Sequence, residues 1–190
     1  MFFATVLLAM APVSIDPAPG HHGLFLRLDL GAGYYRSSSG DVAISGGSGA
    51  LGFSIGGNVA DNVALFVSLF DFAPGMPTVS AGGSSATPRD FTAGAGGAGI
   101  GLNYYFMPMN VFLSATAGVG GMTYHGGFFS SHIGAGLAGR VGAGKEWMIS
   151  ESWGLGLAGY LNFAFTPDEY SGQPGWQTWS PVVAFSATFY

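Results

Sequence analysis

The sequence has no cysteine and very few charged residues, and these two shortages exclude several classes of protein. Without cysteine there is no disulfide framework and no thiolate metal site. Charged residues make up 8% of the 190 residues, whereas the surface of a soluble domain is about 25–35% charged. Lysine and arginine together number five, too few for the basic surface that nucleic-acid binding requires. We therefore expect neither a soluble domain nor a nucleic-acid partner.

Long hydrophobic runs are also missing. Beyond the N-terminal segment there is no run of 18 apolar residues, which excludes transmembrane helices. Yet 48% of the residues are hydrophobic and the mean hydropathy is +0.40, which excludes a disordered chain. Glycine contributes 34 residues, but not at every third position as in collagen. The class that remains is the membrane β-barrel, whose signature is segments of about ten residues with alternating hydrophobicity.

An apolar segment, residues 2–11, opens the chain and is followed by Pro12. It is too short to span a bilayer as a helix, and it matches the apolar part of a secretory signal with a small-x-small site at Ala9-Met10-Ala11. No basic residue precedes the segment, and Pro12 would follow the cut directly. A start site placed too far downstream would explain the missing basic residues. The alternative to a signal peptide is an apolar mature N-terminus that packs on another surface. The sequence predicts residues 1–22 as a whole or truncated signal peptide and leader.

The rest of the chain, residues 23–190, alternates between apolar and small or polar residues. In the first segment Leu26, Leu28 and Leu30 share one face, whereas Arg27 and Asp29 share the other, which is the period of a strand. The same pattern predicts eight strands. The first is residues 23–35, the second ends with residues 48–55, and the others are 63–72, 91–106, 111–120, 132–144, 153–165 and 178–189. The third is apolar on both faces, so its orientation is left open.

Large apolar side chains on one face, and glycine, alanine, serine and rare charges on the other, predict a barrel with its apolar face toward lipid. An open sheet edge does not survive in hydrocarbon, so the sheet must close. The predicted connections alternate between short and longer, as they do in outer-membrane barrels. The predicted fold class is all-β, a closed antiparallel eight-stranded up-and-down transmembrane β-barrel over residues 23–190.

Three segments carry a resemblance to a known class: residues 26–35 (LRLDLGAGYY), residues 142–157 (GAGKEWMISESWGLGL) and residues 185–190 (FSATFY). Together they resemble the small eight-stranded outer-membrane β-barrels of Gram-negative bacteria, the class of the OmpA transmembrane domain, OmpX and OmpW. The resemblance covers about residues 23–190. It implies an integral protein of the bacterial outer membrane, in contact with lipid and lipopolysaccharide and monomeric.

The aromatic C-terminus is similar to the signal that the outer-membrane assembly machinery reads in this class. Phe185, Phe189 and Tyr190 would form it, and the assembly machinery is the expected partner of the last strand. By alternation Phe189, and not the terminal Tyr190, falls on the lipid face.

The polar residues on the inner face are candidates for a lumen network. Their members are Arg27, Asp29, Asn103, Arg140 and Tyr160. They could form an ion-selective constriction, or an internal network of salt bridges that plugs the barrel. Eight strands enclose a space just wide enough for side chains to fill, which favours the plug.

Aromatic residues near the predicted strand ends are candidates for the belt at the membrane–water interface. They are Tyr34, Tyr104, Phe106, Trp147 and Trp153. Lys145 and Glu146, in the turn predicted beside Trp147, are expected to be solvated charges at the periplasmic rim.

The expected function is that of a non-enzymatic outer-membrane barrel, serving envelope integrity or surface interaction through its extracellular loops. The alternative is a narrow channel for a small hydrophobic solute, which an apolar lumen would favour. A more remote alternative is a hydrolase acting on lipid A, built from Ser130, Ser131 and His132 with Asp168 and Glu169. No cofactor and no metal site is predicted, because the pair His21 and His22 alone does not make one.

Overall fold

The computed structural model describes residues 23–126, 129–167 and 175–190, with the side chains of 129–133 left out. Within these residues there is no helix long and apolar enough to cross a membrane. The predicted signal segment, residues 1–22, lies outside the described residues.

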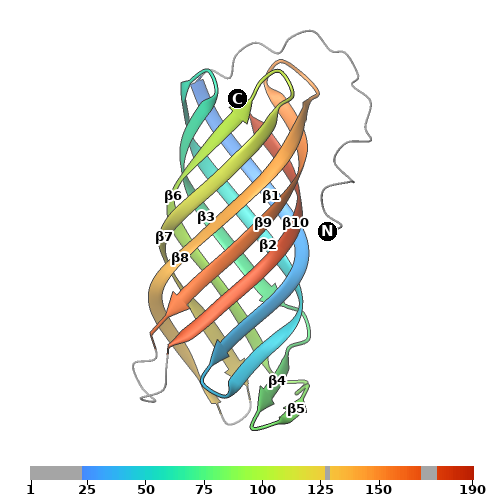
Figure 1. Cartoon of the computed structure of the whole chain (residues 1–190), viewed down its shortest axis with the longest axis vertical. Coiled ribbons are helices and arrows are strands. Elements are labelled where there is room, and N and C mark those ends of the chain that lie inside the picture. The colour runs from blue at the N-terminus through green and yellow to red at the C-terminus, as the bar shows by residue number, and fades with distance from the viewer. Residues whose placement is uncertain (1–22, 127–128, 168–174) are drawn as a thin grey trace.

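Eight long strands form a closed antiparallel barrel (Figure 1). They are β1 (Gly23–Ser39), β2 (Val42–Ala60), β3 (Val63–Pro74), β6 (Thr92–Phe106), β7 (Val111–Gly126), β8 (Phe129–Met148), β9 (Trp153–Thr166) and β10 (Trp176–Phe189). Each pairs with its neighbours along the chain, and β1 also pairs with β10, which closes the sheet. The predicted fold class is confirmed.

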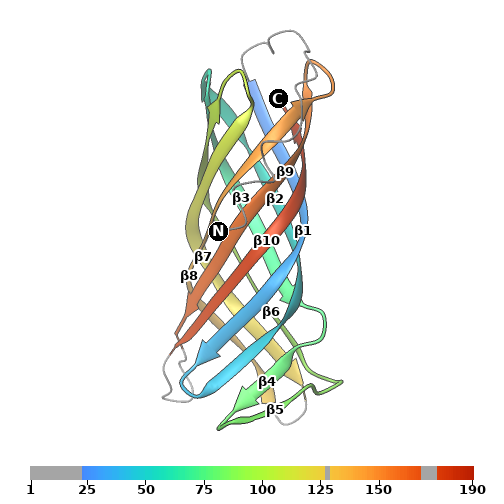
Figure 2. The same ribbon diagram turned by 45° about the vertical axis from the view of Figure 1, so that its right-hand side comes forward.

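The register of the strands fixes the tilt of the barrel. Directly paired residues lead from Leu26 around all eight strands and back to β1 at Arg36, through Ile55, Val67, Ile100, Ala117, Gly139, Phe163 and Trp179. The shear is therefore ten residues, the step from 26 to 36. Strands in such barrels tilt by about 35–45°, and both views show the strands running obliquely around the barrel (Figure 2).

The two ends of the barrel differ. At the terminus end, where β1 begins and β10 ends, short turns at residues 61–62, 107–110 and 149–152 join the strands. At the opposite loop end, β2 continues past β3 and pairs with a small hairpin of β4 (Thr78–Ala81) and β5 (Ser84–Ala86), which projects from the barrel (Figure 1). Several strands are longer than predicted; β1 runs on to Ser39, and a turn at Gly40 and Asp41 joins it to β2.

The two faces of the wall follow the predicted alternation. Large apolar side chains point outward and are exposed, such as Leu30 at 66% and Ile100 at 73%. The third predicted strand, which the sequence leaves without an orientation, turns Phe66, Ser68 and Phe70 inward and Leu65, Val67 and Leu69 outward. The side chains of the inner face fill the lumen.

Candidate functional site: two ion pairs across the lumen

Arg27 and Glu146 form the first ion pair inside the barrel. They come from β1 and β8, which do not neighbour each other in the sheet, so the pair crosses the lumen. Arg27 also donates from Nη2 to the Tyr105 hydroxyl at 2.8 Å and from Nε to Thr188 Oγ1 at 3.1 Å. Thr188 donates to Glu146 at 2.6 Å. Arg27 Nε, Arg27 Nη2 and Glu146 Oε1 are therefore each held by partners on other strands.

Aromatic rings surround this first pair. The guanidinium carbon of Arg27 lies 4.2 Å from the centre of the Phe112 ring and 5.3 Å from that of Phe25. Phe25 in turn stacks on Phe66 with ring centres 5.3 Å apart. The side chains of Arg27 and Glu146 are 2% and 0% exposed. An ion pair so removed from water is stable only because each charge has its partner.

The last residue of the chain closes this cluster at the terminus end. The Tyr190 hydroxyl donates to the Glu146 carboxylate and lies 3.0 Å from the Tyr105 hydroxyl. Burial raises the pKa of Tyr190 far above its usual value of 10.0. The hydroxyl therefore stays protonated and remains a donor to Glu146 throughout the physiological pH range.

Arg140 and Asp29 form the second ion pair, nearer the loop end. Arg140 Nη1 lies 3.1 Å from Asp29 Oδ2, and this pair also joins β8 to β1 across the lumen. Tyr160 supports both charges. Its hydroxyl donates to Asp29 Oδ1 at 3.3 Å, and its ring centre lies 3.6 Å from the guanidinium carbon of Arg140.

The space for Arg140 depends on a glycine. A Cβ atom at Gly52 would lie 2.3 Å from Arg140 Nη1 and 3.1 Å from Asp29 Oδ2. A larger residue at this position would therefore push into the ion pair.

The structure places all five candidates for the lumen network on the inner face, where each is buried. Arg27 lies in the first cluster, and Asp29, Arg140 and Tyr160 form the second. Asn103 joins the first, because its amide nitrogen lies 3.4 Å from the Tyr105 hydroxyl.

The expectation that Glu146 is a solvated charge at the rim is wrong. Strand β8 continues to Met148, so Glu146 follows Arg140, Gly142 and Gly144 on the inner face. The period of two, carried on from Arg140, would have found it. Lys145 points the other way and donates to the Met109 carbonyl at 3.1 Å. Tyr105, Thr188 and Tyr190 were also missed as members of the network.

The predicted belt residues lie on the outer face in two girdles. Tyr104, Phe106, Trp147 and Trp153 lie near the terminus end, where Trp153 packs edge-on against Phe189 at 5.3 Å between ring centres. Tyr34 lies near the loop end, at the height of a second aromatic cluster that was not predicted from the sequence. This cluster is Phe163, Phe165 and Trp179, with ring centres 5.5–5.9 Å apart.

The predicted assembly signal also divides between the two faces. Phe185 and Phe189 point outward, whereas Tyr190 turns into the end of the lumen.

The residues of the hydrolase hypothesis cannot be placed against one another. The side chains of Ser130, Ser131 and His132, and the whole of Asp168 and Glu169, lie outside the described part. Within the described part, no three histidine, aspartate or glutamate residues gather into a group that could hold a metal ion.

Solved structures with this fold are small outer-membrane barrels. Neisserial surface protein A matches with a TM-score of 0.53 and 13% identity, covering 88% of this chain and 98% of that one. The outer membrane protein AlkL matches with a TM-score of 0.51 and 16% identity, covering 95% and 96%. OprG from Pseudomonas aeruginosa matches with a TM-score of 0.48 and 16% identity, covering 92% and 100%.

No family model and no curated protein matches the sequence. The chain thus has the fold of the small eight-stranded outer-membrane barrels, and the resemblance predicted from the sequence is confirmed at this level.

Proposed function

We propose that the protein is an integral barrel of the bacterial outer membrane whose lumen is closed and whose contacts are made at the loop end. It serves envelope integrity or surface interaction and is not an enzyme. The observation that carries the proposal is the pair of ion pairs, Arg27 with Glu146 and Arg140 with Asp29, which bridge opposite walls of the lumen at two heights.

The distance between the two aromatic girdles supports a membrane-spanning role. In β9 the girdle residues Trp153 and Phe163 are ten residues apart. At about 3.3 Å per residue and a tilt of roughly 40°, this corresponds to a height of about 25 Å. That is about the height of the apolar band of outer-membrane barrels. The exposed apolar side chains between the girdles are matched to lipid, including lipopolysaccharide.

The closed lumen argues against the alternative function, a narrow channel for a small hydrophobic solute. A solute passing along the barrel axis would have to separate both ion pairs. Each separation would leave two buried charges without partners. Truncating one partner of a buried pair costs about 3–5 kcal/mol. An apolar solute offers no compensating hydrogen bonds, so passage along the axis is unfavourable.

The loop end is the surface left for contacts with other molecules. The β4–β5 hairpin extends beyond the barrel and carries exposed serine residues, among them Ser84 and Ser85. At the other end, the outward Phe185 and Phe189 of β10 are available to the assembly machinery during insertion. We propose a monomer, since the barrel completes its sheet within one chain.

Labelling with a membrane-impermeant maleimide tests the placement of the two ends. The chain has no cysteine, so single cysteine variants report on one site each. In intact Gram-negative cells the Ser85→Cys variant is expected to be labelled and the Glu151→Cys variant, in an exposed turn at the terminus end, to be protected until the cells are lysed. Labelling of Glu151→Cys in intact cells, or protection of Ser85→Cys, would contradict the proposal.

A further inference from the structure

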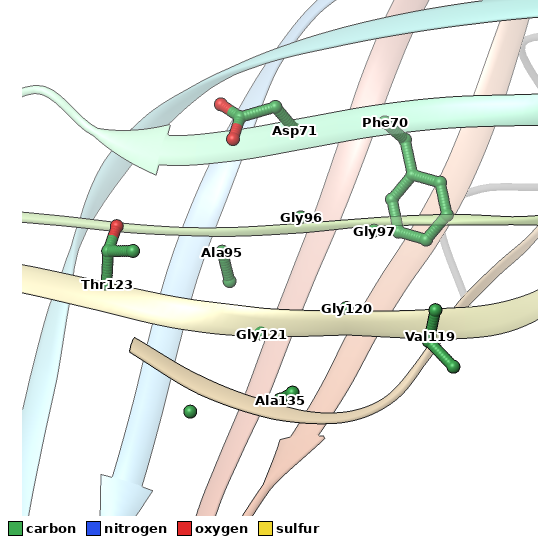
Figure 3. A pocket seen from close by; sticks show the side chains of 11 residues that line it. Phe70, Asp71, Ala95, Gly96, Gly97, Val119, Gly120, Gly121, Thr123 and Ala135 are labelled. Carbon is green, nitrogen blue, oxygen red and sulfur yellow. The ribbon is translucent and has the colours of Figure 1, made fainter. Parts of the chain in front are cut away.

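A pocket of about 410 Å³ lies in the wall of the barrel, across β3, β6, β7 and β8 (Figure 3). Its lining includes residues of the outer face, among them Asp71, Val119, Thr123 and Ala135, all of which are exposed. The pocket therefore opens to the surface that faces the membrane in the proposed function, on which this inference rests.

The pocket exists because one row of paired residues lacks large side chains. Asp71 pairs with Gly96, Gly96 with Gly121, and Gly121 with Ala135. A Cβ atom at Gly96 would lie only 3.1 Å from Asp71 Oδ2, so the carboxylate leans over this glycine. Beyond it the row offers no side chain larger than a methyl group.

Asp71 is a carboxylate among apolar neighbours on the outer face. Its outward neighbours are Leu69 on the same strand and Leu51, with which it pairs on β2. It makes no hydrogen bond or ion pair with any of the described residues. Ionisable residues within membrane-spanning segments are costly and mark functional sites. An unpaired carboxylate here calls for a cationic or hydrogen-bond-donating partner from outside the chain.

The height of Asp71 places it at the boundary between lipid chains and head groups. Through Leu51 it is in register with Leu30 of β1. The shear raises a paired row toward the loop end by about one and a quarter residues per strand. Over the two steps from β1 to β3, Asp71 reaches a height just below Tyr34, on the membrane side of the loop-end girdle.

The outer face also changes from apolar to polar toward the loop end within the pocket. On β3 Leu69 is followed by Asp71, and on β7 Val119 is followed by Gly121 and Thr123. An amphiphile in the leaflet nearer the loop end also changes from apolar to polar in this direction, because its chain points toward the membrane centre and its head group points outward.

We propose that this pocket binds an amphiphile of the outer leaflet that carries a protonated amine. The amine pairs with Asp71, and the first part of the alkyl chain lies over Gly96, Gly121 and Ala135. The negative charge of Asp71 and its position at head-group height select the amine over a neutral or anionic head group.

Native mass spectrometry of the refolded barrel in a non-ionic detergent tests the proposal with three probes of one chain length: octadecylamine, octadecanol and octadecanoic acid. The wild type is expected to bind octadecylamine roughly tenfold more tightly than octadecanol, as one charge-assisted hydrogen bond provides. The near-isosteric Asp71→Asn variant should lose this preference while its binding of octadecanol stays unchanged.

Two alanine variants separate the pocket from the rest of the outer face. Ala135→Leu, on β8, fills the pocket and should weaken the binding of octadecylamine. The control is Ala115→Leu, which changes an exposed outward alanine on β7 outside the pocket; it should leave the binding of octadecylamine unchanged. Equal binding of amine and alcohol by the wild type, or an unchanged preference in Asp71→Asn, would overturn the inference. Because this measurement does not depend on the lumen or on cell-surface placement, its failure would leave the proposed function standing.

Discussion

Replacing Glu146 by alanine is expected to lower the free energy of unfolding by about 3–5 kcal/mol, the usual cost of breaking a buried ion pair. Glu146 accepts hydrogen bonds from Thr188 and Tyr190 and is paired with Arg27, all within a cluster closed to water. Its loss leaves the Arg27 guanidinium without its counter-charge. Denaturant titration of the barrel refolded into lipid vesicles, followed by tryptophan fluorescence, measures the effect.

Two further variants make this prediction specific. Glu151→Ala removes the same charge from an exposed turn and should change the stability by less than about 0.5 kcal/mol. The double variant Arg27→Met/Glu146→Leu, which removes both charges and keeps apolar volume, should recover most of the loss, because buried pairs can be replaced by apolar residues at little cost. A Glu146→Ala variant as stable as the wild type would show that the pair does not stabilise the barrel.

The second large effect is expected at Gly118, where β7 lies close against the backbone of β6. A Cβ atom at Gly118 of β7 would lie 2.0 Å from the Ala98 carbonyl oxygen and 2.4 Å from the Gly99 Cα. Both contacts are with backbone, which cannot rotate away. Gly118→Val should therefore cost at least the upper part of the range of about 1–3 kcal/mol known for overpacking.

The matched control for Gly118→Val is the same substitution at Gly49. That glycine also lies in a strand of the wall, but a Cβ atom there meets nothing within 4 Å. Gly49→Val should fold as well as the wild type. The folded fraction, read from the mobility shift on unheated gel electrophoresis, compares the two; equal yields would contradict the close approach at Gly118.

Most of the fold could be predicted because alternation along a single strand is a local property. Leu26, Leu28 and Leu30 on one face, with Arg27 and Asp29 on the other, define both the strand and its lumen side. The same reasoning places Arg140, Asn103 and Tyr160 on the inner face. It failed at Glu146 only because the strand was ended too early.

The orientation of β3 could not be predicted because it depends on neighbouring strands. Phe66 and Phe70 point inward, where each is opposed by a glycine of β6, Gly101 and Gly97. A Cβ atom at Gly101 would lie 2.2 Å from the Phe66 ring. In the same way, a large inward residue is paired with a glycine on the next strand at Phe112 and Gly144, and at Tyr160 and Gly142. Such complementarity becomes visible only when the register between strands is known.

The contacts between the charged residues depend on register in the same way. The sequence indicates that Arg27, Asp29 and Arg140 share the lumen, but not which charges meet. The shear of the barrel places Arg27 beside Glu146 and Asp29 beside Arg140. Tyr190 joins the first cluster because β10 ends beside β1, which again is a property of closure and not of local pattern.

Planar-bilayer conductance of the refolded wild type tests the central claim, the closed lumen, most directly. The wild type should be silent under voltage. A variant that replaces both pairs by serine, at Arg27, Glu146, Arg140 and Asp29, should show openings because it removes both bridges without leaving an unpaired charge. Arg36→Ser, which removes an exposed arginine of β1, should stay silent. Steady conductance of the wild type would contradict the account and make the two ion pairs the walls of a conduit.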